Sequence, residues 1–264
     1  MKNKIVQIIQ YFITFLGYFI VYLPIMIITL LSFNQSKSSY AWDSFSLKWY
    51  AEIFTNDRLR TAIFNTLTIA TLSTMVATVV GTIIAIGIHS LTKKNRIRMM
   101  ILNNIPVINP DIVTGISLML VFSLLPISFG MPTMLLAHIF FSIPFVVLTV
   151  LPKLKELDPN IYDAALDLGC NHFQGIYKVI IPSIKTGIIA GALIAFTMSI
   201  DDFVISYFTT GNGFDNFSIW LYSAMKRRTV NPAAYAYNTL IVFLTIAVLA
   251  YINFGFNRKE KRRK

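Results

Sequence analysis

Charge and cysteine are both scarce in this chain, and each scarcity excludes a class of protein. Only 13% of the 264 residues are charged, whereas 55% are hydrophobic and the mean hydropathy is +0.64. This balance is far more apolar than that of a soluble globular domain. The single cysteine, Cys170, has no partner for an intramolecular disulfide and cannot by itself build a thiolate zinc site. The composition therefore predicts a folded integral membrane protein.

Motifs of catalysis and nucleotide binding are also missing. The sequence contains no GxxxxGK[ST] phosphate-binding loop, so any ATP would be bound and hydrolysed by another chain. The three histidines, His89, His138 and His172, are scattered and form no HExxH arrangement, and the chain has no GxSG or CxxC motif either. An intramembrane enzyme would need such a group, and single histidines of this kind are more often structural. We expect a non-catalytic protein with no cofactor or metal site of its own.

Long apolar runs recur along the whole chain. Six of them approach the ~20 residues that a helix needs to cross a membrane. They cover about residues 12–31, 62–90, 109–125, 134–151, 186–207 and 233–256, and a shorter apolar piece, Met99–Ile108, precedes the third. We expect one all-α transmembrane domain over residues 1–264, with a long internal loop at 152–185.

The basic residues predict the orientation of these spans. Six spans place both termini on one face, and sixteen of the 23 Lys and Arg residues then fall on that face, against seven on the other. By the positive-inside rule, both termini and the loop at 152–185 are cytoplasmic, in a multi-pass protein of the cell membrane. Contact with lipid accounts for the net charge of +11 without a nucleic-acid partner. The external loops are too short for a domain of their own, so the capture of cargo would need a separate protein.

The cytoplasmic loop predicts a short amphipathic helix that ends at Gly169. Its apolar stripe consists of Ile161, Ala164, Ala165 and Leu168, at i, i+3, i+4 and i+7. A helix of roughly 10 residues is marginal alone and must dock on something. It packs either on the cytoplasmic ends of its own spans or in a groove of a partner.

The same loop resembles the signature of ABC importer permeases, which reads Glu-Ala-Ala, three residues, Gly, nine residues, then Ile-x-Leu-Pro. This chain has Asp163-Ala164-Ala165, three residues, Gly169, nine residues, then Val179-Ile180-Ile181-Pro182. The resemblance implies the ABC type I importer permease fold, with a coupling helix that docks into an ATP-binding subunit. It assigns this coupling to Asp163, Ala164, Ala165, Gly169 and Pro182. The partners it implies are a dimer of ATP-binding subunits, a homologous second permease and an external solute-binding protein.

Further segments resemble the spermidine/putrescine permease family, PotC type. They include Phe45–Tyr50, Pro110–Ser117 and Ser199–Val204. This resemblance implies a translocation path for polyamines. Because related families share several of these segments, a permease for another small solute is the alternative interpretation.

Three carboxylates, Asp111, Asp201 and Asp202, fall in or beside the spans, where a charge is costly unless it faces a cavity or a partner. Neighbouring residues of a helix point about 100° apart, so Asp201 and Asp202 cannot both line one narrow path unless the helix breaks there. Asp111 also has the sequence context of a helix start, in which it would stabilise the N-terminus.

A polyamine path would combine these carboxylates with aromatic faces, for which the candidates are Phe203, Tyr207, Phe208, Trp220 and Tyr222. Aromatic residues near span ends also form interfacial belts, which is the other interpretation of these five. A competing class is an ion-coupled secondary transporter in which the three carboxylates relay protons. That class would need dimerisation or inverted repeats, and the two halves of the sequence show no convincing repeat.

Overall fold

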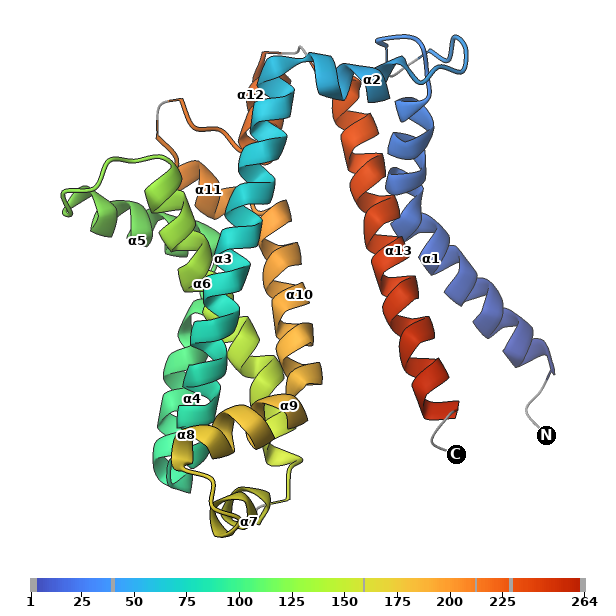
Figure 1. Ribbon diagram of the computed structural model, residues 1–264. Coiled ribbons are helices and arrows are strands. Elements are labelled where there is room, and N and C mark those ends of the chain that lie inside the picture. The colour runs from blue at the N-terminus through green and yellow to red at the C-terminus, as the bar shows by residue number, and fades with distance from the viewer. Residues whose placement is uncertain (1–3, 39–40, 159, 212, 228–229, 262–264) are drawn as a thin grey trace. The chain divides into compact units, whose positions relative to one another are not determined.

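The computed structural model describes residues 4–38, 41–158, 160–211, 213–227 and 230–261 (Figure 1). Within these ranges the regular structure is helical, apart from an isolated bridge between Asn34 and Phe45. This confirms the predicted all-α fold. The basic residues 262–264, part of the tail that predicts the orientation, lie outside the described residues.

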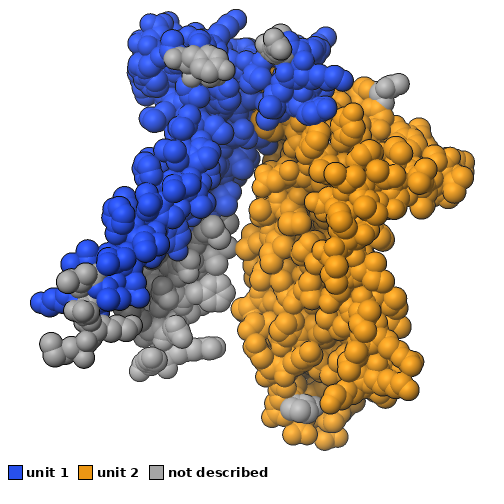
Figure 2. Space-filling view, turned by 180° about the vertical axis from the view of Figure 1, so that it is seen from behind, with its two compact units in different colours: residues 1–60, 221–264 blue, residues 61–220 orange. Residues whose placement is uncertain are grey.

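The chain divides into two compact units, which Figure 2 shows in different colours. Unit 1 comprises residues 1–60 and 221–264, and unit 2 comprises residues 61–220. Two helices, α3 (Asp57–Ser90) and α12 (Phe217–Lys226), begin in one unit and end in the other.

Among the described residues, three helices lie wholly in unit 1: α1 (Lys4–Ser32), α2 (Lys48–Thr55) and α13 (Ala233–Lys261). Helix α13 packs against both α1 and α2. The connection between α1 and α2 is held by Asn34, whose carbonyl accepts a hydrogen bond of 2.6 Å from the indole N–H of Trp49. The side chain of Asn34 also donates to the carbonyl of Ala41 at 2.7 Å. These bonds satisfy polar groups of a loop that is too short for a separate domain.

Unit 2 contains most of α3 and the helices that follow it. They are α4 (Lys93–Ile108), α5 (Asp111–Ser123), α6 (Met131–Lys155), α7 (Ile161–Asp167), α8 (His172–Gly175), the π-helix η1 (Ile176–Ile180), α9 (Ile181–Ser183), α10 (Lys185–Asp201) and α11 (Val204–Thr209).

The core of unit 2 lies between α3, α6 and α10. Val146, Val147 and Val150 of α6 pack there with Ala85 of α3, and all four are fully buried. Helix α10 approaches α6 closely at Gly191, where an added Cβ would lie 3.1 Å from Cα of Val146. Small residues at helix contacts allow this approach, which drives helix association in a membrane.

Within the described residues, three helices are long and apolar enough to cross a membrane: α1 from Val6, α3 and α6. Two bent pairs have the same property when each is taken together. The pair α4 and α5 bends by 99°, and the segment His172–Ser183 bends by 71° from α10. The residues Ala233–Ala247 of α13 form a shorter apolar stretch. The number of six spans stays a prediction.

Two of the expected spans differ from a single long helix. Helix α5 has 13 residues, or about 20 Å at 1.5 Å per residue, and follows α4 only after a sharp bend. The expected fifth span, 186–207, is divided into α10 and α11 by an extended Asp202 with φ −65° and ψ 127°. The helix break without which Asp201 and Asp202 could not both line one path is therefore present, and their role in such a path stays a prediction.

Candidate functional site

A cavity of about 340 Å³ lies in unit 2, at the two helix breaks just described. All three carboxylates from the sequence analysis, Asp111, Asp201 and Asp202, line it. None of the described residues that line the cavity is basic. The structure thus brings together, from two separate segments, acidic groups that are 90 residues apart in the chain.

The break between α4 and α5 follows from the prolines around it. Pro110 restricts Asn109 to an extended conformation, and Asn109 accordingly ends α4 with φ −71° and ψ 135°. The side chain of Asn109 donates a hydrogen bond of 3.3 Å to the hydroxyl of Thr114, one turn into α5. Asp111 is the first residue of α5, with Pro110 in the capping position. This places the Asp111 carboxylate at the bend, beside the cavity.

The break between α10 and α11 is stabilised by Asp202 itself. Its carboxylate accepts hydrogen bonds from the backbone N–H of Ser206 at 2.7 Å and of Ile205 at 3.3 Å. Both groups belong to the first turn of α11, whose unpaired N–H groups favour a negative charge. The Asp202 side chain is only 9% exposed, so these bonds compensate for the burial of its charge.

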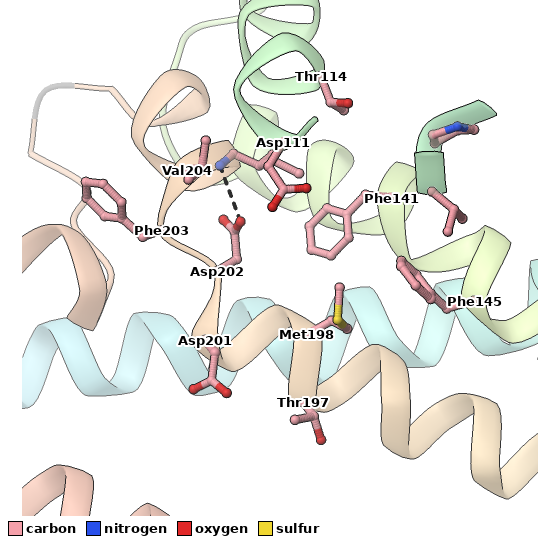
Figure 3. Close-up of a pocket in the computed structure, with 13 residues that line it drawn as sticks. Asp111, Thr114, Phe141, Phe145, Thr197, Met198, Asp201, Asp202, Phe203 and Val204 are labelled. Carbon is pink, nitrogen blue, oxygen red and sulfur yellow. Dashed lines mark hydrogen bonds between the residues drawn. The ribbon is translucent and has the colours of Figure 1, made fainter. Parts of the chain in front are cut away.

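The three carboxylates do not point the same way. Figure 3 shows Asp111 and Asp202 directed toward the same space, with Asp201 pointing away from it on the other side of the chain. Asp201 is exposed, whereas Asp202 is largely buried. The two neighbouring aspartates therefore have different surroundings.

Phenylalanine rings supply the aromatic wall of the cavity. Phe141 and Phe145 come from α6, and Phe203 comes from the break after α10 (Figure 3). Phe141 and Phe145 were missed by sequence reasoning, although their spacing of four residues places them on one face of a helix.

Of the aromatic residues named from the sequence, Phe203 lines the cavity and the others do not. Tyr207 and Trp220 are not among the lining residues; Tyr207 packs on Phe203 at a centroid distance of 5.5 Å, and Trp220 stacks on Phe217 at 5.9 Å. Tyr222 belongs to unit 1. A role of these three in a cation path stays a prediction.

The histidines take different positions. His138 is fully buried in α6 and contacts Ser199 and Ser206 through its ring nitrogens. His172, in the loop, lies 2.9 Å from the hydroxyl of Tyr162. No group of three or more His, Cys, Asp or Glu side chains that could hold a metal ion occurs in the described part of the chain.

The predicted amphipathic helix of the loop is α7. It begins at Ile161 and ends with a left-handed Gly169, whose φ is +87°. The N–H of Gly169 bonds to the carbonyl of Leu166, and the N–H of Cys170 bonds to that of Ala165, which is the Schellman pattern. The glycine closes the helix, as its place in the sequence predicts.

The apolar stripe of α7 is divided between two surroundings. Ala165 is buried, and Ile161 packs against the core of unit 2. Ala164 is exposed, as is 87% of Leu168. Asp163 also lies on the exposed side, while Pro182 lies in α9, immediately before the bend into α10. One part of the stripe thus docks on the chain itself and another part remains open.

Comparison with known proteins gives consistent matches. Residues 77–262 match the family described as binding-protein-dependent transport system inner membrane component. The chain is 34% identical to the spermidine/putrescine transport system permease protein PotC of Escherichia coli (strain K12), over 88% of each chain. It is also 34% identical to the putrescine transport system permease protein PotI of the same strain, over 95% of this chain and 92% of that one.

A solved structure shares the fold at lower sequence identity. It is a bacterial alginate ABC transporter in complex with an alginate pentasaccharide-bound periplasmic protein. One of its chains aligns with a TM-score of 0.69 and 17% identity, covering 92% of each chain. This similarity concerns the fold of an ABC importer permease.

Proposed function

Because the chain belongs to the family of binding-protein-dependent transport system inner membrane components, we propose that it forms, with a homologous second permease, the polyamine path of an ATP-driven importer. Spermidine or putrescine would be delivered by an external solute-binding protein, of the kind present in the alginate transporter complex. The substrate follows from two relatives that are polyamine permeases and from the chemistry of the cavity.

This proposal rests on the carboxylates and phenylalanine rings that line the cavity at the two helix breaks. Polyamines join ammonium groups by apolar stems, and they are bound by carboxylates together with aromatic faces. Asp111 and Asp202 face one space in the cavity, and Phe141, Phe145 and Phe203 line it. Broken helices near the middle of a membrane commonly build ion and substrate sites in transporters.

The exposed part of α7 supports the coupling to ATP hydrolysis. A helix of seven residues with an open apolar Leu168 and an acidic Asp163 fits a groove on another protein. We assign this groove to the ATP-binding subunit, with Asp163, Ala164 and Gly169 at the contact. Ala165 is buried and packs α7 on the rest of unit 2, and Pro182 marks the entry into the next span. On this view both termini are cytoplasmic and the chain crosses the cell membrane six times, each bent pair counting as one span.

Identifying the energy source of uptake tests whether the protein belongs to an ATP-driven importer. The complete transporter, with both permeases, the ATP-binding subunits and the solute-binding protein, is reconstituted in proteoliposomes and supplied with labelled spermidine. Uptake is expected to stop when ATP is depleted and to persist when the proton gradient is collapsed. Loss of uptake on collapse of the gradient alone, with ATP present, would instead favour an ion-coupled secondary transporter.

A further inference from the structure

His138 lies behind the break between α10 and α11 and spans it. The residue is 0% exposed and does not line the cavity. Its Nδ1 atom lies 2.6 Å from the hydroxyl of Ser199, near the end of α10. Its Nε2 atom lies 2.9 Å from the hydroxyl of Ser206, which is on α11. One side chain of α6 therefore joins the two helices on either side of Asp202.

The serines are themselves held by further polar groups. Ser206 Oγ accepts a hydrogen bond of 2.8 Å from the side-chain amide of Asn216. Ser199 Oγ lies 3.2 Å from the hydroxyl of Ser73 on α3. A buried polar group without a partner is costly, and a network in which each group has one specifies a single arrangement. This cluster therefore fixes the geometry of the break more strictly than apolar packing would.

The imidazole is also close to the acidic group. Nε2 of His138 lies 3.6 Å from Oδ2 of Asp202. A carboxylate at this distance favours the tautomer with its proton on Nε2, because the N–H end of the ring dipole then faces the negative charge. In that tautomer Nε2–H donates to the Ser206 hydroxyl, and Nδ1 accepts from the Ser199 hydroxyl. The backbone N–H of the same Ser206 donates to Oδ2 of Asp202.

We propose that His138 is a positioning residue for Asp202. By bridging Ser199 and Ser206 it holds the two helix ends at the separation in which the Asp202 carboxylate caps α11 and faces the cavity. The inference rests on the proposed function, in which Asp202 contacts the cation. His138 lies outside the cavity lining, so its effect on transport passes through Asp202.

A double-mutant cycle tests this dependence. Uptake of labelled spermidine is measured per assembled complex for His138→Leu, Asp202→Asn and the double variant in the complete reconstituted transporter. Each single variant is expected to lose at least about fivefold, and the double variant to match Asp202→Asn within about twofold. Asp202→Glu, which keeps the charge, takes the place of Asp202→Asn if the latter leaves too little uptake to measure. A double variant whose loss is the product of the two single losses would overturn the proposal.

Two further variants separate positioning from folding. Ser142 lies one turn after His138 on α6 and is equally buried, and its hydroxyl has no hydrogen-bond partner within the ranges that the structure describes. Ser142→Ala is the matched control and is expected to transport normally. Ser206→Ala removes the bridging hydroxyl but keeps the backbone N–H that binds Asp202. If His138→Leu does not assemble, the cycle is run with Ser206→Ala, and the same criterion decides it.

The possible failures are distinguishable. If the unmodified transporter takes up no polyamine, the proposed function fails, and this inference fails with it. If the unmodified transporter and the Asp202→Asn variant both take up polyamine normally, Asp202 does not contact the cation. The positioning role of His138 is then refuted as well. If both single variants lose uptake independently, the proposed function stands and only the positioning role is refuted.

Discussion

The backbone N–H of Ser206 donates a hydrogen bond of 2.7 Å to Oδ2 of Asp202, across the point where α10 ends and α11 begins. The carboxylate therefore has two tasks, since it caps a short helix and also lines the cavity. Its neighbour Asp201 is exposed and points away from the space that Asp202 faces (Figure 3). Asp202 therefore stabilises the break, and mutation of each aspartate in turn tests what each contributes.

Substitution of Asp202 separates charge from capping. Asparagine caps a helix about as well as aspartate, so Asp202→Asn is expected to lower polyamine uptake while the complex still assembles. Alanine loses the cap as well, which costs about 1 kcal/mol of stability, so Asp202→Ala is expected to reduce the melting temperature too. Uptake and thermal unfolding of the purified complex provide the two measurements. Equal stability of the two variants would argue against the capping role.

Asp201 offers a simpler test of charge in the path. Because its side chain is exposed, Asp201→Asn is expected to leave the melting temperature unchanged. Because Asp201 lines the cavity but points away from the space that Asp202 faces, the variant is expected to lower spermidine uptake by a smaller factor than Asp202→Asn does. Asp57→Asn is the control, because Asp57 is an exposed aspartate of unit 1 that pairs with the exposed Arg60, and such pairs contribute little. Normal uptake by Asp201→Asn would remove this residue from the path.

The turn after α7 makes a prediction about coupling. Gly169 has φ +87°, which costs a residue with a side chain about 1–2 kcal/mol, although an added Cβ would meet nothing within 4 Å. Gly169→Ala and Gly169→Glu are therefore both expected to insert normally and to lose ATP-driven uptake, Glu more severely because its charge would also face the docking partner. Co-purification of the ATP-binding subunit measures the docking.

Gly213 provides the matched control for that experiment. It has φ +88° and equally open surroundings, but it lies between α11 and α12, away from the predicted cytoplasmic loop. Gly213→Ala should carry the same backbone strain and retain the ATP-binding subunit. Loss of the subunit in both variants would show that strain in general, rather than the α7 turn, is responsible.

Close packing of α6 and α10 predicts a stability defect at Gly191. A Cβ there would lie 3.1 Å from Cα of Val146 and 2.5 Å from the hydroxyl of Thr149. Gly191→Val is expected to destabilise the protein by about 1–3 kcal/mol, because a backbone atom has to move. Gly87→Val, where nothing lies within 4 Å, is the control. Comparable melting temperatures for the two variants would mean that the helices tolerate a wider separation.

The sequence predicts the helical membrane fold because long apolar segments leave few alternatives to a helix in a bilayer. It also predicts the end of α7 at Gly169, where glycine relieves a backbone conformation that other residues resist. The sequence does not predict the break at Asp202, because the apolar run continues through it. It shows only that the helix must break there if Asp201 and Asp202 are to line one path. The cause of the break is a set of bonds to Ser206 and, through Ser199, to His138, which are tertiary and leave no local pattern.

The convergence of residues on the cavity is likewise not visible in the sequence. Asp111 and Asp202 were identified because charges in apolar segments stand out, but their convergence depends on the bends at Asn109 and Asp202. Phe141 and Phe145 were missed because Phe is common throughout the apolar segments of this chain. Burial against a neighbouring helix and exposure to a cavity look alike in a single sequence.

Competition between substrates tests whether polyamines pass through this cavity. Uptake of labelled spermidine is measured in proteoliposomes that contain the complete transporter, with unlabelled putrescine, an amino acid or thiamine as competitor, for the unmodified chain and for Asp201→Asn and Asp202→Asn. We predict that putrescine competes, that the amino acid and thiamine do not, and that uptake falls in the aspartate variants. Uptake that both variants retain, or that the amino acid or thiamine suppresses as strongly as putrescine, would contradict a polyamine path through this cavity.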